Sequence, residues 1–164
     1  MPTRQDPEPF VPADFTPPTH LDHAAFRLRP LSPEHNERDH VAWMDSIDHI
    51  RATPGYPDGS WPKPMSLEQN LADLQRHFAD FRDRVGFTYT VLDARGPADR
   101  ADVIGCVYIY PDDRPGTDVH VQSWVRADLA DLDALLATTI REWLEDAWPW
   151  QDEQIRDHPR HISS

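Results

Sequence analysis

The clearest pattern of apolar and polar positions along the chain is helical and lies between residues 66 and 85. Apolar side chains recur there at steps of three and four residues, at Leu67, Leu71, Leu74, Phe78, Phe81 and Val85. Such spacing places them on one face of an α-helix. Ser66 and Gln69 have the spacing of an N-terminal capping box, and Gly86 is typical of a helix end. We therefore predict an amphipathic helix that packs this face against the core.

Two further helices are predicted, one on each side of it along the chain. Ser32, Pro33 and Glu34 are typical of a helix start, and this helix is expected to run to about Arg51. Its buried residues are expected to be Trp43, Met44, Ile47 and Ile50. A last helix is predicted from about Asp128 or Asp131 to Asp146, with inward side chains at Leu129, Leu132, Leu135, Leu136, Trp143 and Leu144.

Strand-like alternation occurs over residues 26–31, 87–92, 103–110 and 118–125, and residues 151–156 are a candidate for one more strand. Short connectors between the later strands favour an antiparallel meander. Residues 52–65 contain four prolines and two glycines, so we predict an irregular loop there. The predicted fold class is α+β, with a mixed, mainly antiparallel sheet flanked by helices.

Proline is concentrated at the beginning of the chain, where six of the 17 prolines precede residue 20. Because proline fixes φ and lacks a backbone donor, we expect residues 1–25 to form a proline-rich arm that is extended on the surface or disordered. Residues 26–156 are expected to form a single domain and residues 157–164 a tail, since 164 residues suffice for one core.

The charge balance narrows the range of partners. Sixteen Lys and Arg residues against 29 Asp and Glu residues give a formal net charge of −13, and Lys63 is the only lysine. A chain this acidic does not offer the basic stripe that nucleic acid requires, and an anionic membrane surface is disfavoured for the same reason. No apolar run is long enough to span a membrane and no secretory signal opens the chain, so we expect a cytoplasmic protein.

The sequence also argues against a metal site. Cys106 is the only cysteine, which excludes an internal disulfide and a Cys-based metal centre. His35 and Asp39, and likewise Asp45 and His49, are four residues apart on the first predicted helix, but no third ligand accompanies them. We interpret these pairs as solvated helical faces and predict no metal.

Three stretches resemble one known superfamily. They are Phe26 to Leu31 with its LRPL text, Val103 to Tyr108 (VIGCVY) and Gln122 to Asp128 (QSWVRAD). Together with the predicted order of strand, helix, helix, three strands and helix, they resemble the front part of the GNAT superfamily of N-acetyltransferases, from about residue 26 to residue 150. The superfamily continues with a further helix and strand, so the chain looks like a shortened, degenerate member.

The resemblance implies acetyl-CoA as cofactor, held by backbone after the fourth strand. In the superfamily this segment reads Gln/Arg-x-x-Gly-x-Gly/Ala and binds pyrophosphate at a helix start. The candidate cofactor-binding residues here are Trp124, Val125, Arg126, Asp131, Leu132, Asp133 and Ala134. The basic residue and both glycines are missing, and Asp128, Asp131 and Asp133 would repel an anion. The alternative role of these acids is to cap the helix and complement its dipole.

His120 is the best-placed candidate for a catalytic base, because histidine titrates near neutral pH and the side chain shares a strand face with Gln122 and Trp124. Tyr108, on the neighbouring strand, is a second catalytic candidate. The ordinary alternatives are a histidine on a partly exposed strand face and a tyrosine that packs within the sheet.

The loop between the first two helices carries the candidate substrate-binding residues Tyr56, Asp58 and Trp61. By position it resembles the acceptor-binding loop of the superfamily, and aromatic rings with one acid suit a cationic amine. The alternative is that Tyr56 and Trp61 merely cover the core.

Two functions therefore remain open. The first is an N-acyltransferase that moves an acetyl group from acetyl-CoA to a small amine. The second is a non-catalytic GNAT-like binding or interaction module that has lost the CoA pyrophosphate site, and that could form a homodimer through an exposed sheet edge. The missing glycines and the acidic turn favour the second.

Overall fold

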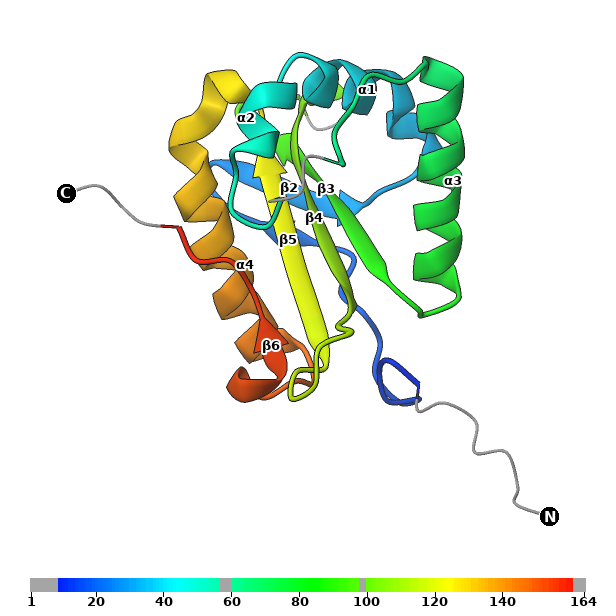
Figure 1. The fold of residues 1–164 in the computed structure, drawn as a ribbon, viewed down its shortest axis with the longest axis vertical. Helices are drawn as coiled ribbons and strands as arrows, with labels where there is room; N and C mark the ends of the chain where they lie inside the picture. Colours follow the sequence, from blue (N-terminus) through cyan, green and yellow to red (C-terminus); the bar gives the residue numbers. More distant parts are fainter. Residues whose placement is uncertain (1–8, 57–59, 98–99, 161–164) are drawn as a thin grey trace.

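A six-stranded sheet organises the computed structural model, which describes residues 9–56, 60–97 and 100–160 (Figure 1). The strands lie in chain order and are antiparallel, except that the last two are parallel. This confirms the predicted mixed, mainly antiparallel sheet. The strands are β1 (Leu21–Asp22), β2 (Phe26–Pro30), β3 (Phe87–Asp93), β4 (Val103–Pro111), β5 (Val119–Val125) and β6 (Ile155–Arg156).

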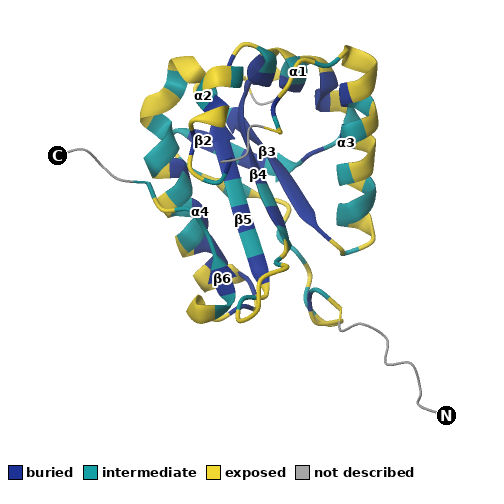
Figure 2. Ribbon diagram, viewed as in Figure 1, coloured by how far each residue is buried: buried dark blue, intermediate teal, exposed yellow. Residues whose placement is uncertain are grey.

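Helices cover both faces of the sheet, and the strands between them are largely buried (Figure 2). Three helices pack on one face through Trp43, Ile50 and Leu74, whereas the last helix packs on the other face through Leu136 and Ile140. None of the helices in the described ranges is long and apolar enough to cross a membrane. The helices are α1 (Asn36–Met44), α2 (Ile47–Arg51), α3 (Leu67–Arg82) and α4 (Asp133–Ala147), with short 3-10 turns at η1 (Pro33–His35), η3 (Ala127–Leu132) and η4 (Asp152–Gln154).

The first predicted helix is broken in two, which corrects the expectation of one helix to Arg51. The break lies at Ser46, whose φ of −128° is not helical. The Ser46 side chain is buried, and its Oγ accepts a hydrogen bond of 2.9 Å from the backbone nitrogen of Ala127. This hydrogen bond joins the helix break to the turn after β5. Helical periodicity in the sequence does not predict such a contact.

The buried face of α3 is rotated relative to the predicted one. The capping box at Ser66 and Gln69 is present, with hydrogen bonds of 3.1 and 2.9 Å. The apolar stripe, however, is only partly covered: Leu74 is buried, whereas the predicted inward residues Leu67, Phe78 and Val85 are 40%, 46% and 50% exposed. Leu135 of α4, also predicted to face inward, is exposed as well.

The segment before β2 contributes to the core. Val11 is buried, and the rings of Phe10 and Phe15 pack on Trp150 and Trp148, with centroids 5.0 and 5.3 Å apart. The hydroxyl of Tyr89 donates to the Pro18 carbonyl at 2.5 Å. Residues 9–25 are thus attached to the sheet through side chains and through β1.

An irregularity in β4 sets the orientation of the residues that follow it. The register with β3 shifts between Val91 and Leu92, next to Gly105. A Cβ on Gly105 would lie 2.4 Å from the carbonyl oxygen of Trp124, so only glycine fits there. Beyond this point Cys106 and Tyr108 face α1 and α3.

Candidate functional site: an aromatic cavity

A cavity of about 330 Å³ lies between α1, α3, the loop that joins α2 to α3, and the middle of β4 and β5. Three predicted site residues line it together, namely Tyr56, Trp61 and Tyr108. Asp58 lies outside the described residues. The cavity wall also includes Asp39, Trp43 and His77, together with Asp73 and Arg76, which form an ion pair with each other at 3.2 Å.

Aromatic rings form much of the cavity wall. The Trp61 ring is central, since its centroid lies 5.6 Å from that of Trp43, 5.9 Å from Tyr56 and 6.3 Å from Tyr108. The hydroxyl of Tyr108 accepts a hydrogen bond of 3.0 Å from Trp124 Nε1, which fixes this ring from the sheet side. The faces of such rings attract cations.

Asp39 places a carboxylate in this aromatic surrounding. It is only 4% exposed, and its Oδ2 accepts a hydrogen bond of 3.0 Å from Asn70 Nδ2. Asn70 also donates to Asn36 Oδ1 at 2.9 Å and accepts from Trp43 Nε1 at 3.1 Å, so it joins α1 to α3. Burial raises the pKa of Asp39 to about 6. Within the described ranges no Lys, Arg or His forms an ion pair with Asp39.

Tyr56 adds an unsatisfied polar atom. Its side chain is 7% exposed, and its hydroxyl has no hydrogen-bond partner among the described residues. Burial raises the pKa of this hydroxyl well above its usual value, so the group is a neutral phenol. A buried hydroxyl without a partner costs roughly 1–3 kcal/mol, and a polar ligand atom in the cavity would remove that cost.

The structure places His120 outside the lining of this cavity. Its Nε2 lies 2.7 Å from Nε2 of His158, in the segment after β6. Burial, and then the nearby Arg156 charge, lowers the pKa of His120 to about 4. Gln122, on the same face of β5, does reach the cavity, and its Nε2 donates to the Gly55 carbonyl at 2.7 Å. The role of His120 as a base stays a prediction.

The predicted cofactor turn lies after β5, on η3 and the start of α4. Trp124 and Val125 are buried in the sheet, Asp131 is exposed, and Leu132 and Ala134 are half-buried. Three amides of this turn already donate hydrogen bonds within the protein: Ala127 to Ser46 Oγ, Leu129 to the Arg126 carbonyl and Asp133 to the Ala130 carbonyl.

Asp133 does not cap α4, which has no side-chain cap. Instead its carboxylate pairs with Arg160, whose Nε lies 2.8 Å from Oδ2. The same guanidinium donates to the Ser123 carbonyl at 2.9 Å. Arg160 thereby joins β5 to the start of α4, and the space enclosed by β5, α4 and residues 157–160 is only about 10 Å³.

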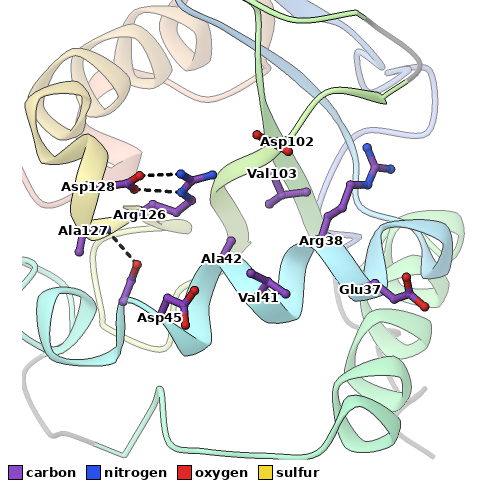
Figure 3. Close-up of a pocket in the computed structure, with 11 residues that line it drawn as sticks. Glu37, Arg38, Val41, Ala42, Asp45, Asp102, Val103, Arg126, Ala127 and Asp128 are labelled. Carbon is purple, nitrogen blue, oxygen red and sulfur yellow. Dashed lines mark hydrogen bonds and ion pairs between the residues drawn. The ribbon is translucent and has the colours of Figure 1, made fainter.

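A wider cleft, of about 470 Å³, lies between α1, the start of β4 and the end of β5 (Figure 3). Arg126 reaches it, but two hydrogen bonds of 3.0 and 2.6 Å join its guanidinium to Asp128, as Figure 3 shows. This contact holds the pKa of Asp128 below its usual value. Two arginines and four carboxylates line the cleft, which makes it acidic: Arg38, Arg126, Glu37, Asp45, Asp102 and Asp128.

These observations decide whether the residues fit acetyl-CoA. A pyrophosphate needs free amides or cations, whereas here three amides and both Arg126 and Arg160 already have partners inside the protein. A carboxylate about 4 Å from a phosphate would cost on the order of 1–4 kcal/mol. The engaged groups and the carboxylates of the described turn therefore weigh against the cofactor. Among the described residues, no group of three His, Cys, Asp or Glu side chains is arranged to hold a metal ion.

The comparisons with known proteins establish the fold. The sequence matches no family model and no curated protein. Ribosomal-protein-S5-alanine acetyltransferase from Vibrio fischeri superposes with a TM-score of 0.58 at 14% identity, over 79% of this chain and 69% of that one. The microcin C7 self-immunity acetyltransferase MccE, solved with acetyl-CoA and AMP, gives 0.57 at 9% identity, over 79% and 67%.

A third solved structure, the ribosomal L7/L12 α-N-protein acetyltransferase RimL in complex with coenzyme A, gives a TM-score of 0.56 at 9% identity, over 76% of this chain and 65% of that one. The chain thus has the fold of the GNAT acetyltransferases, which confirms the fold that the resemblance implied. At these identities the similarity concerns the fold.

The interpretation of His35 and Asp39 as a solvated helical face is wrong, because both side chains are buried. Sequence reasoning missed Asn70 and His77, for which a signal exists: Asn70, Leu74, His77 and Phe81 follow one another at steps of four, three and four on α3. Polar residues on the inner face of a helix call for a buried partner or a ligand. The apolar stripe through Leu67 and Phe78 has the same helical spacing, so the sequence analysis assigned the inner face to that stripe instead.

Proposed function

We propose that this protein binds a small organic cation, an amine, in the aromatic cavity. The observation that carries the proposal is the buried Asp39 carboxylate, which has no cationic partner among the described residues and lies beside a cluster of aromatic rings. The formal charge of −13 also favours approach of a cation.

The chemistry of the wall matches this class of ligand. Each ring face contributes about 0.5–2 kcal/mol to a desolvated cation, and an ammonium would neutralise the carboxylate that burial leaves uncompensated. The unpartnered Tyr56 hydroxyl could accept a hydrogen bond from such a ligand. A volume of about 330 Å³ suits a small molecule rather than a peptide.

The test is a titration with tetramethylammonium chloride, followed by tryptophan fluorescence and matched against sodium chloride. Asp39→Asn should weaken binding at least tenfold, because the variant retains the acceptor for Asn70 but loses the charge. Affinity should fall below about pH 6, since protonation neutralises Asp39 there.

Asp128→Asn is the matched control, because it removes one carboxylate from the acidic cleft of Figure 3 and none from the cavity. It should leave the affinity within twofold of the wild type. Binding that depends on Asp128 and not on Asp39 would refute the proposed site.

The second candidate function is acetyl transfer to the same amine. The acetyltransferase activity of the proteins that share this fold favours it. The turn after β5 argues against it, because three of its amides and the guanidinium of Arg126 already have partners and several carboxylates lie near it. Micromolar binding of acetyl-CoA in a calorimetric titration would support transfer, and no binding up to millimolar concentration would leave the amine-binding function.

A further inference from the structure

His77 of α3 belongs to the wall of the aromatic cavity, and hydrogen bonds to two side chains outside the cavity lining hold its ring. Its ring centroid lies 5.7 Å from that of Tyr108. Its Nδ1 lies 2.8 Å from the hydroxyl of Tyr110 and 2.9 Å from Oγ1 of Thr88. No hydrogen bond to its Nε2 exists within the described ranges of the chain.

The proton positions in this group follow from the donors and acceptors present. The Tyr110 hydroxyl donates to Asp80 Oδ2 at 2.8 Å, because a carboxylate only accepts. The single hydroxyl proton is thereby assigned, so in its 2.8 Å contact with Nδ1 of His77 the tyrosine oxygen is the acceptor. Nδ1 of His77 therefore carries a proton.

The remaining nitrogen, Nε2, is then a lone-pair acceptor as long as the ring is neutral. Burial lowers the pKa of His77 to about 4, and the adjacent Arg76 charge contributes in the same direction. At neutral pH the Asp80, Tyr110 and Thr88 side chains thus maintain one tautomer of one neutral imidazole in the cavity wall.

We infer that His77 determines which cations the cavity accepts: its Nε2 takes a hydrogen bond from an N–H of the ligand, so ammonium ions that carry N–H are preferred to quaternary ones. This inference rests on the proposed function. Asp39 and the rings supply attraction to any small cation, whereas His77 adds a contact that only an N–H donor can make.

The tautomer is tested without any ligand. Long-range ¹H–¹⁵N spectra of the whole protein at pH 7 should show His77 protonated at Nδ1 and unprotonated at Nε2. Tyr110→Phe, which removes the hydroxyl behind the ring and changes no residue of the cavity wall, should allow the other tautomer. A wild-type ring protonated at Nε2, or doubly protonated at pH 7, overturns the inference.

Specificity is tested with methylammonium and tetramethylammonium. His77→Leu should weaken methylammonium binding about tenfold, as expected for loss of one hydrogen bond to a charged group, and should leave tetramethylammonium within twofold. His77→Gln, whose Oε1 can accept, should restore part of the methylammonium affinity. Phe78→Leu, on the exposed side of α3, is the control and should change neither affinity.

The outcomes separate the two proposals. Suppose that both ions bind the wild type and that His77→Leu weakens the binding of both equally or of neither. His77 then only packs in the wall, and the inference fails while the proposed cation site is supported. If neither ion binds, the proposed function fails and the inference with it. If His77→Leu does not fold, Tyr110→Phe is used in its place. If the spectra show both tautomers of His77 in that variant and its preference between the two ions is unchanged, the inference is overturned.

Discussion

Asp39 is the residue on which the proposed function and the stability of the protein both depend. A carboxylate that is 4% exposed and lacks a cation is costly to ionise, which is why its pKa rises to about 6. Asn70 supplies a hydrogen bond but no charge. Perturbed pKa values of this kind concentrate at functional sites, and Asp39 lines a cavity with aromatic walls.

The raised pKa of Asp39 predicts how stability depends on pH. The folded state holds this proton more tightly than the unfolded state, whose pKa is near 3.8, so stability falls as the pH rises from about 4 to about 6. The difference amounts to about 3 kcal/mol. Asp39→Asn removes it, and we expect the variant to unfold at higher urea concentration than the wild type at pH 7.5 and at a similar concentration near pH 4. A variant that is less stable than the wild type at pH 7.5 would contradict this.

Among the elements, β4 and the turn after β5 depend on close contacts between backbones. Gly105 lies where β4 changes register, under the carbonyl of Trp124. The broken helix belongs to the same region, because Ser46 between α1 and α2 accepts from Ala127 just beyond β5. Strand, turn and helix break thus fix the position of Tyr108 and of α1, which carries Asp39.

Gly105→Ala tests this arrangement. Its methyl group would meet a backbone oxygen at 2.4 Å, so β4 and β5 must separate, and we expect a loss of about 2–4 kcal/mol in the free energy of unfolding. Gly96→Ala is the matched control, because no atom lies within 4 Å of the added carbon, and it should change stability by less than about 0.5 kcal/mol. If the two substitutions change the free energy of unfolding equally in urea denaturation, the close contact between Gly105 and the Trp124 carbonyl does not require glycine.

For the molecule as a whole, the two ends of the described chain are attached to the sheet. Val11 belongs to the core cluster between the sheet and α4, and Arg160 joins Ser123 to Asp133 across the predicted cofactor turn. The edge strands β1 and β6 have two residues each. Such short edges offer few backbone groups to a second copy, and the predicted homodimer through a sheet edge stays a prediction.

Arg160→Ala tests what the C-terminal contact does. The variant leaves the half-buried Asp133 carboxylate without its cation, so we expect a loss on the order of 2 kcal/mol in stability. Arg82→Ala, which removes an exposed ion pair with Asp83, should leave the stability nearly unchanged, because solvent screens such a pair. Calorimetric titration with acetyl-CoA should show no binding up to millimolar concentration for the wild type and for both variants. Micromolar binding by Arg160→Ala alone would mean that this arginine is what keeps the cofactor out.

The sequence by itself determined the order of helices and strands from β2 onward, apart from the break between α1 and α2, as well as the α3 capping box, the antiparallel meander and the aromatic residues of the loop around Tyr56 and Trp61, because each depends on neighbours within a few positions. Only the tertiary structure decided which polar side chains enter the cavity. Asp39 meets Asn70 across 31 positions and His77 meets Tyr110 across 33. The spacing of Asn70 and His77 on α3 indicates a polar inner face, but a single sequence does not identify partners at such separations. For the same reason the acidic turn can be read from the sequence, whereas the pairing of Asp133 with Arg160 cannot.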